Sequence, residues 1–124
     1  QTYDSKSYES VLHGVYPVEE DIVREMSRHP ETTFYAMVSG ESMKDAGLQN
    51  GDIVVIDKSL EPKNGDIIIA AVDGEFTIKE FRMDAANHCA WLIPHNDRYQ
   101  PIRVTQEDNF SVWGVVTHTI HKFR

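Results

Sequence analysis

Cysteine pairs, long apolar runs and an excess of basic residues are all missing from this sequence of 124 residues. Its one cysteine, Cys89, has no partner for an internal disulfide, so nothing in the chain requires an oxidising compartment. No apolar run reaches transmembrane length, and no stretch has the basic start, apolar middle and small-residue exit of a signal peptide. These absences predict a soluble, cytoplasmic protein without direct membrane binding.

Basic residues are scarce relative to acidic ones. The chain has 12 Lys and Arg against 20 Asp and Glu, a formal net charge of −8 at pH 7. Because nucleic-acid binding needs a basic surface that neutralises phosphates, this balance argues against strong nucleic-acid binding by this chain. Hydrophobic residues at 40% and charged residues at 26% are close to the globular average, which excludes wholesale disorder. Since the first residue is Gln1 rather than Met, we expect a fragment or a trimmed product.

The first 30 residues differ in pattern from the rest of the chain. Residues 1–17 are polar and lack periodicity, which predicts a flexible N-terminal arm. One short helix is expected to follow, because acidic residues at 19–21 suit a first helical turn and Pro30 limits its length. We therefore divide the chain into an arm with a short helix, residues 1–30, and a β domain, residues 31–124.

The β domain is predicted from short apolar runs separated by turn residues. These runs predict strands at 34–38, 53–56, 67–72, 76–81, 91–93 and 112–120. Asp73-Gly74 predicts a two-residue hairpin, since both residues tolerate positive φ. The phrase Asn-Gly-Asp-Ile, at Asn50 and again at Asn64, indicates repeated turn chemistry rather than a duplicated functional unit. The expected fold class is mainly β, a compact and strongly curved domain.

Ser42 and Lys79 are the residues whose surroundings could support catalysis. Ser42 lies two residues after Gly40 at the end of an expected strand, where a serine can lie next to backbone N–H groups. A serine hydroxyl needs a base, and a lysine can serve when burial depresses its pKa. Lys79 lies on the same face of strand 76–81 as Thr77 and Phe81. The pattern alone favours simpler interpretations, a solvated Lys79 and a Ser42 that only stabilises a turn.

No other cluster predicts a catalytic or metal site. The six histidines show no Ser-His-Asp order. His118 and His121 would point to opposite faces of a strand, and His88-Cys89 lacks partners at zinc spacing. We expect no metal and no cofactor.

Two pairs of segments resemble the LexA/UmuD family of self-cleaving serine peptidases, most closely its UmuD branch. Residues 39–57 (SGESMKDAGLQNGDIVVID) are similar to the nucleophile region, and residues 64–79 (NGDIIIAAVDGEFTIK) to the lysine strand. Residues 93–96 (IPHN) and 112–116 (VWGVV) complete the pattern. The spacing of 37 residues between the serine and the lysine also fits, and the likeness covers about residues 33–124.

This resemblance implies a β fold of the LexA/UmuD C-terminal type and a Ser-Lys dyad. Neutral Lys79 would take the proton from Ser42, which would attack a peptide bond in the protein's own arm. The backbone N–H groups of Ser42 and Met43 would stabilise the oxyanion. The nearest match to the family's cleavage site is Val-Leu-His-Gly at 11–14, which implies a cut between His13 and Gly14 with histidine in the place of a small residue.

The resemblance also implies a role in the SOS response to DNA damage. RecA bound to single-stranded DNA would promote cleavage, and the homodimeric product would act as an accessory subunit of an error-prone translesion DNA polymerase. One alternative is the C-terminal dimerisation and autocleavage domain of a LexA-like or phage-type transcriptional repressor. Another, of a different class, is a dimeric binding module that does not cleave.

Overall fold

Seven antiparallel strands form one bent sheet, and a two-residue strand pairs at its side. The computed structural model describes residues Thr2–Tyr3 and 30–124. The order in the sheet is β2-β3-β8-β4-β5-β6-β7, and β1 pairs with β5. The strands are β1 (Thr2–Tyr3), β2 (Thr33–Met37), β3 (Ile53–Asp57), β4 (Ile67–Val72), β5 (Glu75–Asp84), β6 (Cys89–Ile93), β7 (Ile102–Val104) and β8 (Phe110–Ile120).

Short 3₁₀ helices occupy four of the connections between the described strands. They are η1 (Pro30–Thr32), η2 (Lys44–Ala46), η3 (Ala85–Asn87) and η4 (Gln106–Asp108). Within the described residues, no helix is long and apolar enough to cross a membrane.

The predicted mainly β fold is confirmed, and each of the six predicted strands is present. The strand at 67–72 matches β4, whereas β5 and β6 extend beyond the predicted 76–81 and 91–93. The strands β1 and β7 were not predicted, because two and three residues are too few to show an alternation. The rest of the arm after β1, the short helix after residue 17 and the His13–Gly14 bond lie outside the described residues.

The predicted hairpin at Asp73-Gly74 joins β4 to β5. Val72 pairs directly with Glu75, so the loop has two residues. Asp73 has φ of 51° and Gly74 has φ of 84°, both in the left-handed region that a two-residue hairpin requires. This hairpin fixes the register that places Lys79 opposite Ile68.

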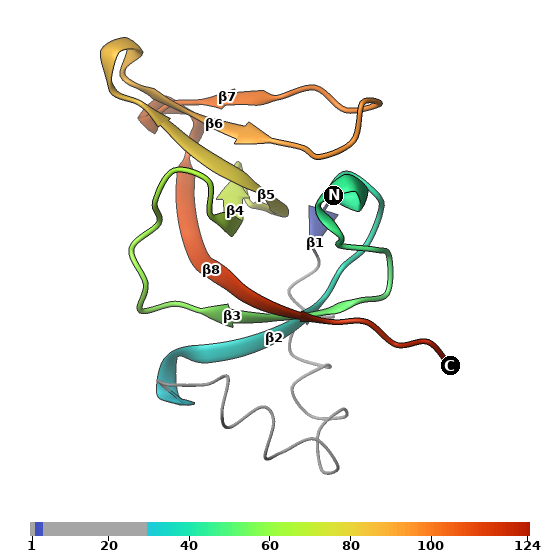
Figure 1. Cartoon of the computed structure of the whole chain (residues 1–124). Coiled ribbons are helices and arrows are strands. Elements are labelled where there is room, and N and C mark those ends of the chain that lie inside the picture. The colour runs from blue at the N-terminus through green and yellow to red at the C-terminus, as the bar shows by residue number, and fades with distance from the viewer. Residues whose placement is uncertain (1, 4–29) are drawn as a thin grey trace.

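The curvature of the sheet comes from β8. Its second half pairs with β3 and its first half with β4, and the register shifts once against each partner. Such bulges bend a strand and increase its twist. As Figure 1 shows, β8 curves from the layer of β2 and β3 to the part of the sheet formed by β4 to β7.

Two apolar clusters form the core, and β4 contributes to both. Ile69 belongs to the first cluster, whereas Ile68 and Ala70 belong to the second, because successive side chains of a strand point to opposite faces. The first cluster also contains Val38 and Met43, which flank Ser42. The loop that carries the candidate nucleophile is therefore fixed by burial on both sides.

Candidate active site

Ser42 lies in a loop that leaves β2 and ends in η2. Met43 is 1% exposed and anchors the loop in the core next to Ile78 of β5. Gly40 has φ of 89°, a conformation that a side chain would strain, and Gly47 ends η2 in the left-handed region. The loop places Ser42 in the interior, with none of its surface exposed.

Lys79 reaches Ser42 from the middle of β5. Its Nζ lies 2.9 Å from Ser42 Oγ, 2.7 Å from Thr77 Oγ1 and 3.1 Å from the carbonyl oxygen of Ile78. The residue is 4% exposed, so the solvated-lysine interpretation is wrong. Thr77 shares its face of the strand, as the alternation predicted.

Burial lowers the pKa of Lys79 from its ordinary 10.5 to about 8. The cause is desolvation, which disfavours the charged ammonium. Among the described residues, no carboxylate forms an ion pair with Lys79 that would offset this effect. The neutral form that a general base requires therefore becomes abundant at a lower pH than for an ordinary lysine.

The contacts of Nζ match the bonding of a neutral amine. Such an amine has two N–H donors, and Thr77 Oγ1 and the Ile78 carbonyl oxygen can accept both. Its lone pair is then left to accept the hydroxyl proton of Ser42. In the charged form the third N–H donates to Ser42 Oγ instead. The same geometry thus accommodates both states of a general base.

The backbone beside Ser42 offers unused donors. No hydrogen bond among the described residues uses the N–H group of Ser42 or of Met43. Buried N–H groups are nearly always paired, so two such donors in one turn are unusual. They are available to an oxyanion that forms next to Ser42 Oγ.

A cavity of about 360 Å³ opens beside Lys79. Phe76, Thr77 and Lys79 of β5 line one wall, and Tyr99 and Ile102 line another. Along this part of β5 the strand β1 pairs with it, Thr2 opposite Thr77, so an extended chain fits this edge. A larger cavity of about 1060 Å³ lies elsewhere, along β6, β7 and the start of β8, and does not include the dyad.

The structure brings Ser42 and Lys79 together and adds residues that the sequence analysis did not single out. Thr77 contacts the amine, and its i, i+2 spacing from Lys79 was the available signal. His95 contacts the Ser42 loop through its backbone and Glu80 through its ring. The family pattern includes the segments of Thr77 and His95 but does not indicate these contacts, because they join segments far apart along the chain.

Comparisons with known proteins show which family the chain resembles. The model of the Peptidase S24-like family matches residues 3–117. The ImpA protein of Salmonella typhimurium is 43% identical over 95 residues, which cover 77% of this chain and 63% of ImpA. The MucA protein of Escherichia coli is 36% identical over 118 residues, which cover 94% of this chain and 78% of MucA.

A protein named as a repressor is also similar to this chain. The LexA repressor of Corynebacterium efficiens is 35% identical over 114 residues, which cover 92% of this chain and 45% of the repressor. The chain spans less than two thirds of the length of ImpA and less than half of that of this repressor.

Proposed function

The chain belongs to the Peptidase S24-like family, in agreement with its predicted likeness to LexA/UmuD proteins, and we propose that it is a serine endopeptidase that cuts its own N-terminal arm. Ser42 is the nucleophile and Lys79 the general base. The observation that carries this proposal is the 2.9 Å contact between Lys79 Nζ and Ser42 Oγ, both buried and without a competing carboxylate.

The proposed reaction has two steps, acylation of Ser42 and hydrolysis of the acyl-enzyme, and Ser42 and Lys79 act in both. Lys79 accepts the hydroxyl proton as Ser42 Oγ attacks the carbonyl carbon of the scissile bond, and the N–H groups of Ser42 and Met43 stabilise the oxyanion. Lys79 then gives the proton to the leaving amine as the C–N bond breaks. Water hydrolyses the acyl-enzyme with Lys79 again as base, which restores the serine.

The proposed scissile bond is His13–Gly14, and the proposed role is in the SOS response. The protein acts as a homodimer, a RecA filament on single-stranded DNA promotes its cleavage, and the product joins an error-prone translesion polymerase as an accessory subunit. Similarity to MucA over 78% of that protein's length supports this over a repressor domain. The repressor domain remains the second candidate, favoured by the LexA match over 92% of this chain.

The proposal is tested by following self-cleavage of the intact chain by mass spectrometry. Wild type should be cut once in the arm, and Ser42→Ala should show no cut. Lys79→Arg should also abolish cleavage, since a guanidinium stays protonated and cannot act as base. A rate for Lys79→Arg equal to that of wild type would remove Lys79 from the mechanism. An uncut wild type, with and without a RecA filament, would support the non-cleaving binding module instead.

The pH dependence of the same rate tests the base. Because Lys79 must be neutral and its pKa is about 8, the first-order rate should rise with pH and level off above it. The neutral fraction predicts an increase of about tenfold between pH 7 and pH 9. A rate that is flat over this range contradicts a lysine base. A cut at another bond would contradict only the assignment of His13–Gly14.

A further inference from the structure

Three hydrogen bonds fasten the segment after β6 to the Ser42 loop. The backbone N–H of His95 donates to the carbonyl oxygen of Ser42 over 2.8 Å, and the N–H of Asp45 donates to the carbonyl oxygen of His95 over 2.8 Å. Asn96 Nδ2 donates to the carbonyl oxygen of Glu41 over 2.8 Å. His95 is therefore joined directly to the backbone of the nucleophile.

The ring of His95 makes a second connection, to the strand that carries the base. Its Nε2 lies 2.7 Å from Oε1 of Glu80, the residue that follows Lys79 in β5. The Glu80 side chain is 13% exposed and that of His95 is 34% exposed, so solvent weakens this pair only in part. Glu80 also accepts a hydrogen bond from Arg82 Nε over 2.6 Å.

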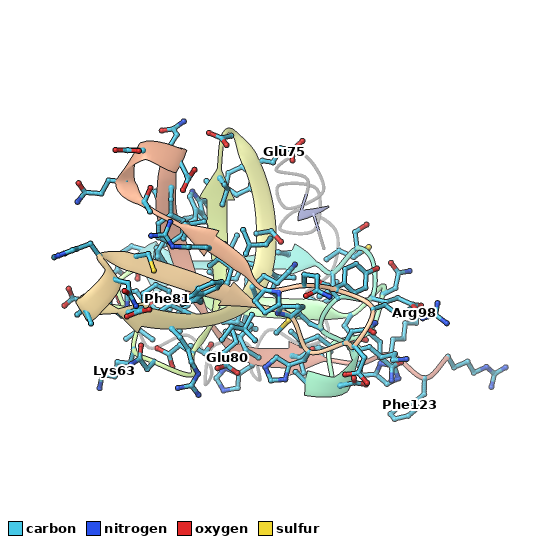
Figure 2. All side chains as sticks on the ribbon, turned by 90° about the horizontal axis from the view of Figure 1, so that it is seen from above. Lys63, Glu75, Glu80, Phe81, Arg98 and Phe123 are labelled. Carbon is cyan, nitrogen blue, oxygen red and sulfur yellow. The ribbon has the colours of Figure 1, made fainter. Side chains whose placement is uncertain are left out.

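The strand β5 also carries Glu75, which Figure 2 labels together with Glu80. Glu75, at the start of the strand, lies well apart from Glu80. Glu75 lines the cavity beside Lys79, whereas Glu80 does not. The His95–Glu80 contact therefore lies outside the cavity and touches none of the atoms that react.

We propose that His95 and Glu80 are positioning residues, which hold the Ser42 loop at the correct distance from Lys79. This inference rests on the proposed function and deepens it. The loop belongs to no strand, so no ladder of hydrogen bonds fixes it against β5. The β5–β6 ladder pairs Glu80 with Ile93, and His95 extends this connection to the loop, since its backbone holds Ser42 and its ring holds the neighbour of Lys79.

The link does not depend on the charge of the histidine. Nε2–H donates to the Glu80 carboxylate both in the protonated ring and in the neutral tautomer that carries the proton on Nε2. Glutamine places an amide N–H donor near the same point, whereas methionine has similar bulk and no donor. Comparing these two substitutions distinguishes the effect of losing the hydrogen bond from the effect of changing the side-chain volume.

The experiment compares His95→Met, His95→Gln and the matched control His118→Met in the intact chain. The control replaces an exposed histidine whose ring, within the described part of the chain, bonds only to the neighbouring Thr117. Two rates are measured at pH 8, self-cleavage and labelling of Ser42 by an alkyl fluorophosphonate. In the labelling step the Oγ–P bond forms, the P–F bond breaks, fluoride leaves and Lys79 takes the hydroxyl proton.

We expect His95→Met to slow both rates by about 10- to 100-fold, because a displacement of about 1 Å can cost 10²-fold in an active site. His95→Gln should stay within about threefold of wild type, as should His118→Met. Glu80→Leu should slow both rates as much as His95→Met does. The double variant of Glu80→Leu and His95→Met should be no slower than the slower single variant, since the two side chains act as one unit.

Several results would overturn the positioning role. These are a His95→Met variant within threefold of wild type, a His95→Gln variant as slow as His95→Met, or additive losses in the double variant. If His95→Met unfolds at a lower urea concentration than wild type, the rates of Glu80→Gln and Glu80→Leu are compared instead. Glu80→Gln keeps an acceptor for His95 and should be faster than Glu80→Leu, and equal rates would overturn the positioning role. Failure of the proposed function has a different signature, because wild type itself then neither cuts nor reacts at Ser42.

Discussion

The two Asn-Gly-Asp-Ile turns have the same sequence and support the two halves of the candidate active site differently. In the first, before β3, Gly51 donates its N–H to the Val38 carbonyl oxygen over 2.8 Å, and Val38 donates back to Asp52 over 2.8 Å. Asn50 Oδ1 accepts the N–H of Gly40 over 2.9 Å. This turn therefore holds the loop that leads to Ser42.

The second turn, before β4, makes the corresponding bonds to β5. Gly65 donates its N–H to the Phe81 carbonyl oxygen over 2.9 Å, and Phe81 donates back to Asp66 over 2.8 Å. Asn64 Oδ1 accepts the N–H of Met83 over 2.7 Å. This turn therefore holds the strand that carries Lys79.

The two turns differ in how many other contacts hold the segment that each turn binds. Met83 already pairs with Ala90 in the ladder between β5 and β6, whereas Gly40 lies in no strand. Asp52 is 2% exposed and also contacts His121, whereas Asp66 is half-buried. Local sequence therefore determines the conformation of each turn. The surrounding contacts determine how much the site depends on that turn.

The largest difference is expected between Asp52→Ala and Asp66→Ala. Asp52, itself 2% exposed, accepts the Gln49 N–H over 2.9 Å and bonds to Nδ1 of the partly exposed His121 over 2.6 Å, and alanine removes both contacts. We expect the free energy of unfolding to fall by about 3 kcal/mol for Asp52→Ala and about 1 kcal/mol for Asp66→Ala. Urea denaturation at pH 7 measures both free energies of unfolding. Equal losses would contradict the expectation that the more buried aspartate contributes more to stability.

A smaller difference is expected between Asn50→Ala and Asn64→Ala, in activity rather than stability. Without Asn50 the N–H of Gly40 loses its acceptor, and the Ser42 loop can shift against Lys79. We expect self-cleavage to slow about fivefold for Asn50→Ala and less than twofold for Asn64→Ala, since positioning errors of a fraction of an ångström affect the rate. Asn50→Asp keeps the accepting oxygen and should cut close to the wild-type rate. Equal rates for the two alanine variants would count against the comparison.

Much of this architecture could be predicted from the sequence, because the turns and the alternation are local. The hairpin at Asp73-Gly74 was predicted from two residues, and the alternation of β5 placed Thr77 and Lys79 on one face. The pairing of Ser42 with Lys79 came from resemblance to a family, since no local pattern measures a distance across 37 residues.

The burial of Lys79 could not be predicted from its own strand. Its alternation is compatible with a solvated lysine, and its burial depends on segments distant in sequence, among them the loop that carries Ser42. The link from His95 to Ser42 and Glu80 escaped prediction for the same reason, because it joins three segments that are distant in sequence.

The smallest difference is expected between Gly51→Ala and Gly65→Ala. Gly51 has φ of 92° and Gly65 has φ of 94°, so alanine is strained equally at both. A Cβ atom would meet nothing within 4 Å at Gly51 and only Arg82 Nη2 at 3.8 Å at Gly65, which is an ordinary contact. We expect each substitution to lower the free energy of unfolding by about 1 kcal/mol, the cost of a left-handed residue less the gain from a stiffer unfolded chain. Neither position offers a steric reason for a difference between the two variants. If their urea midpoints differ by more than the error of the measurement, the two turns are not equivalent even in their local structure.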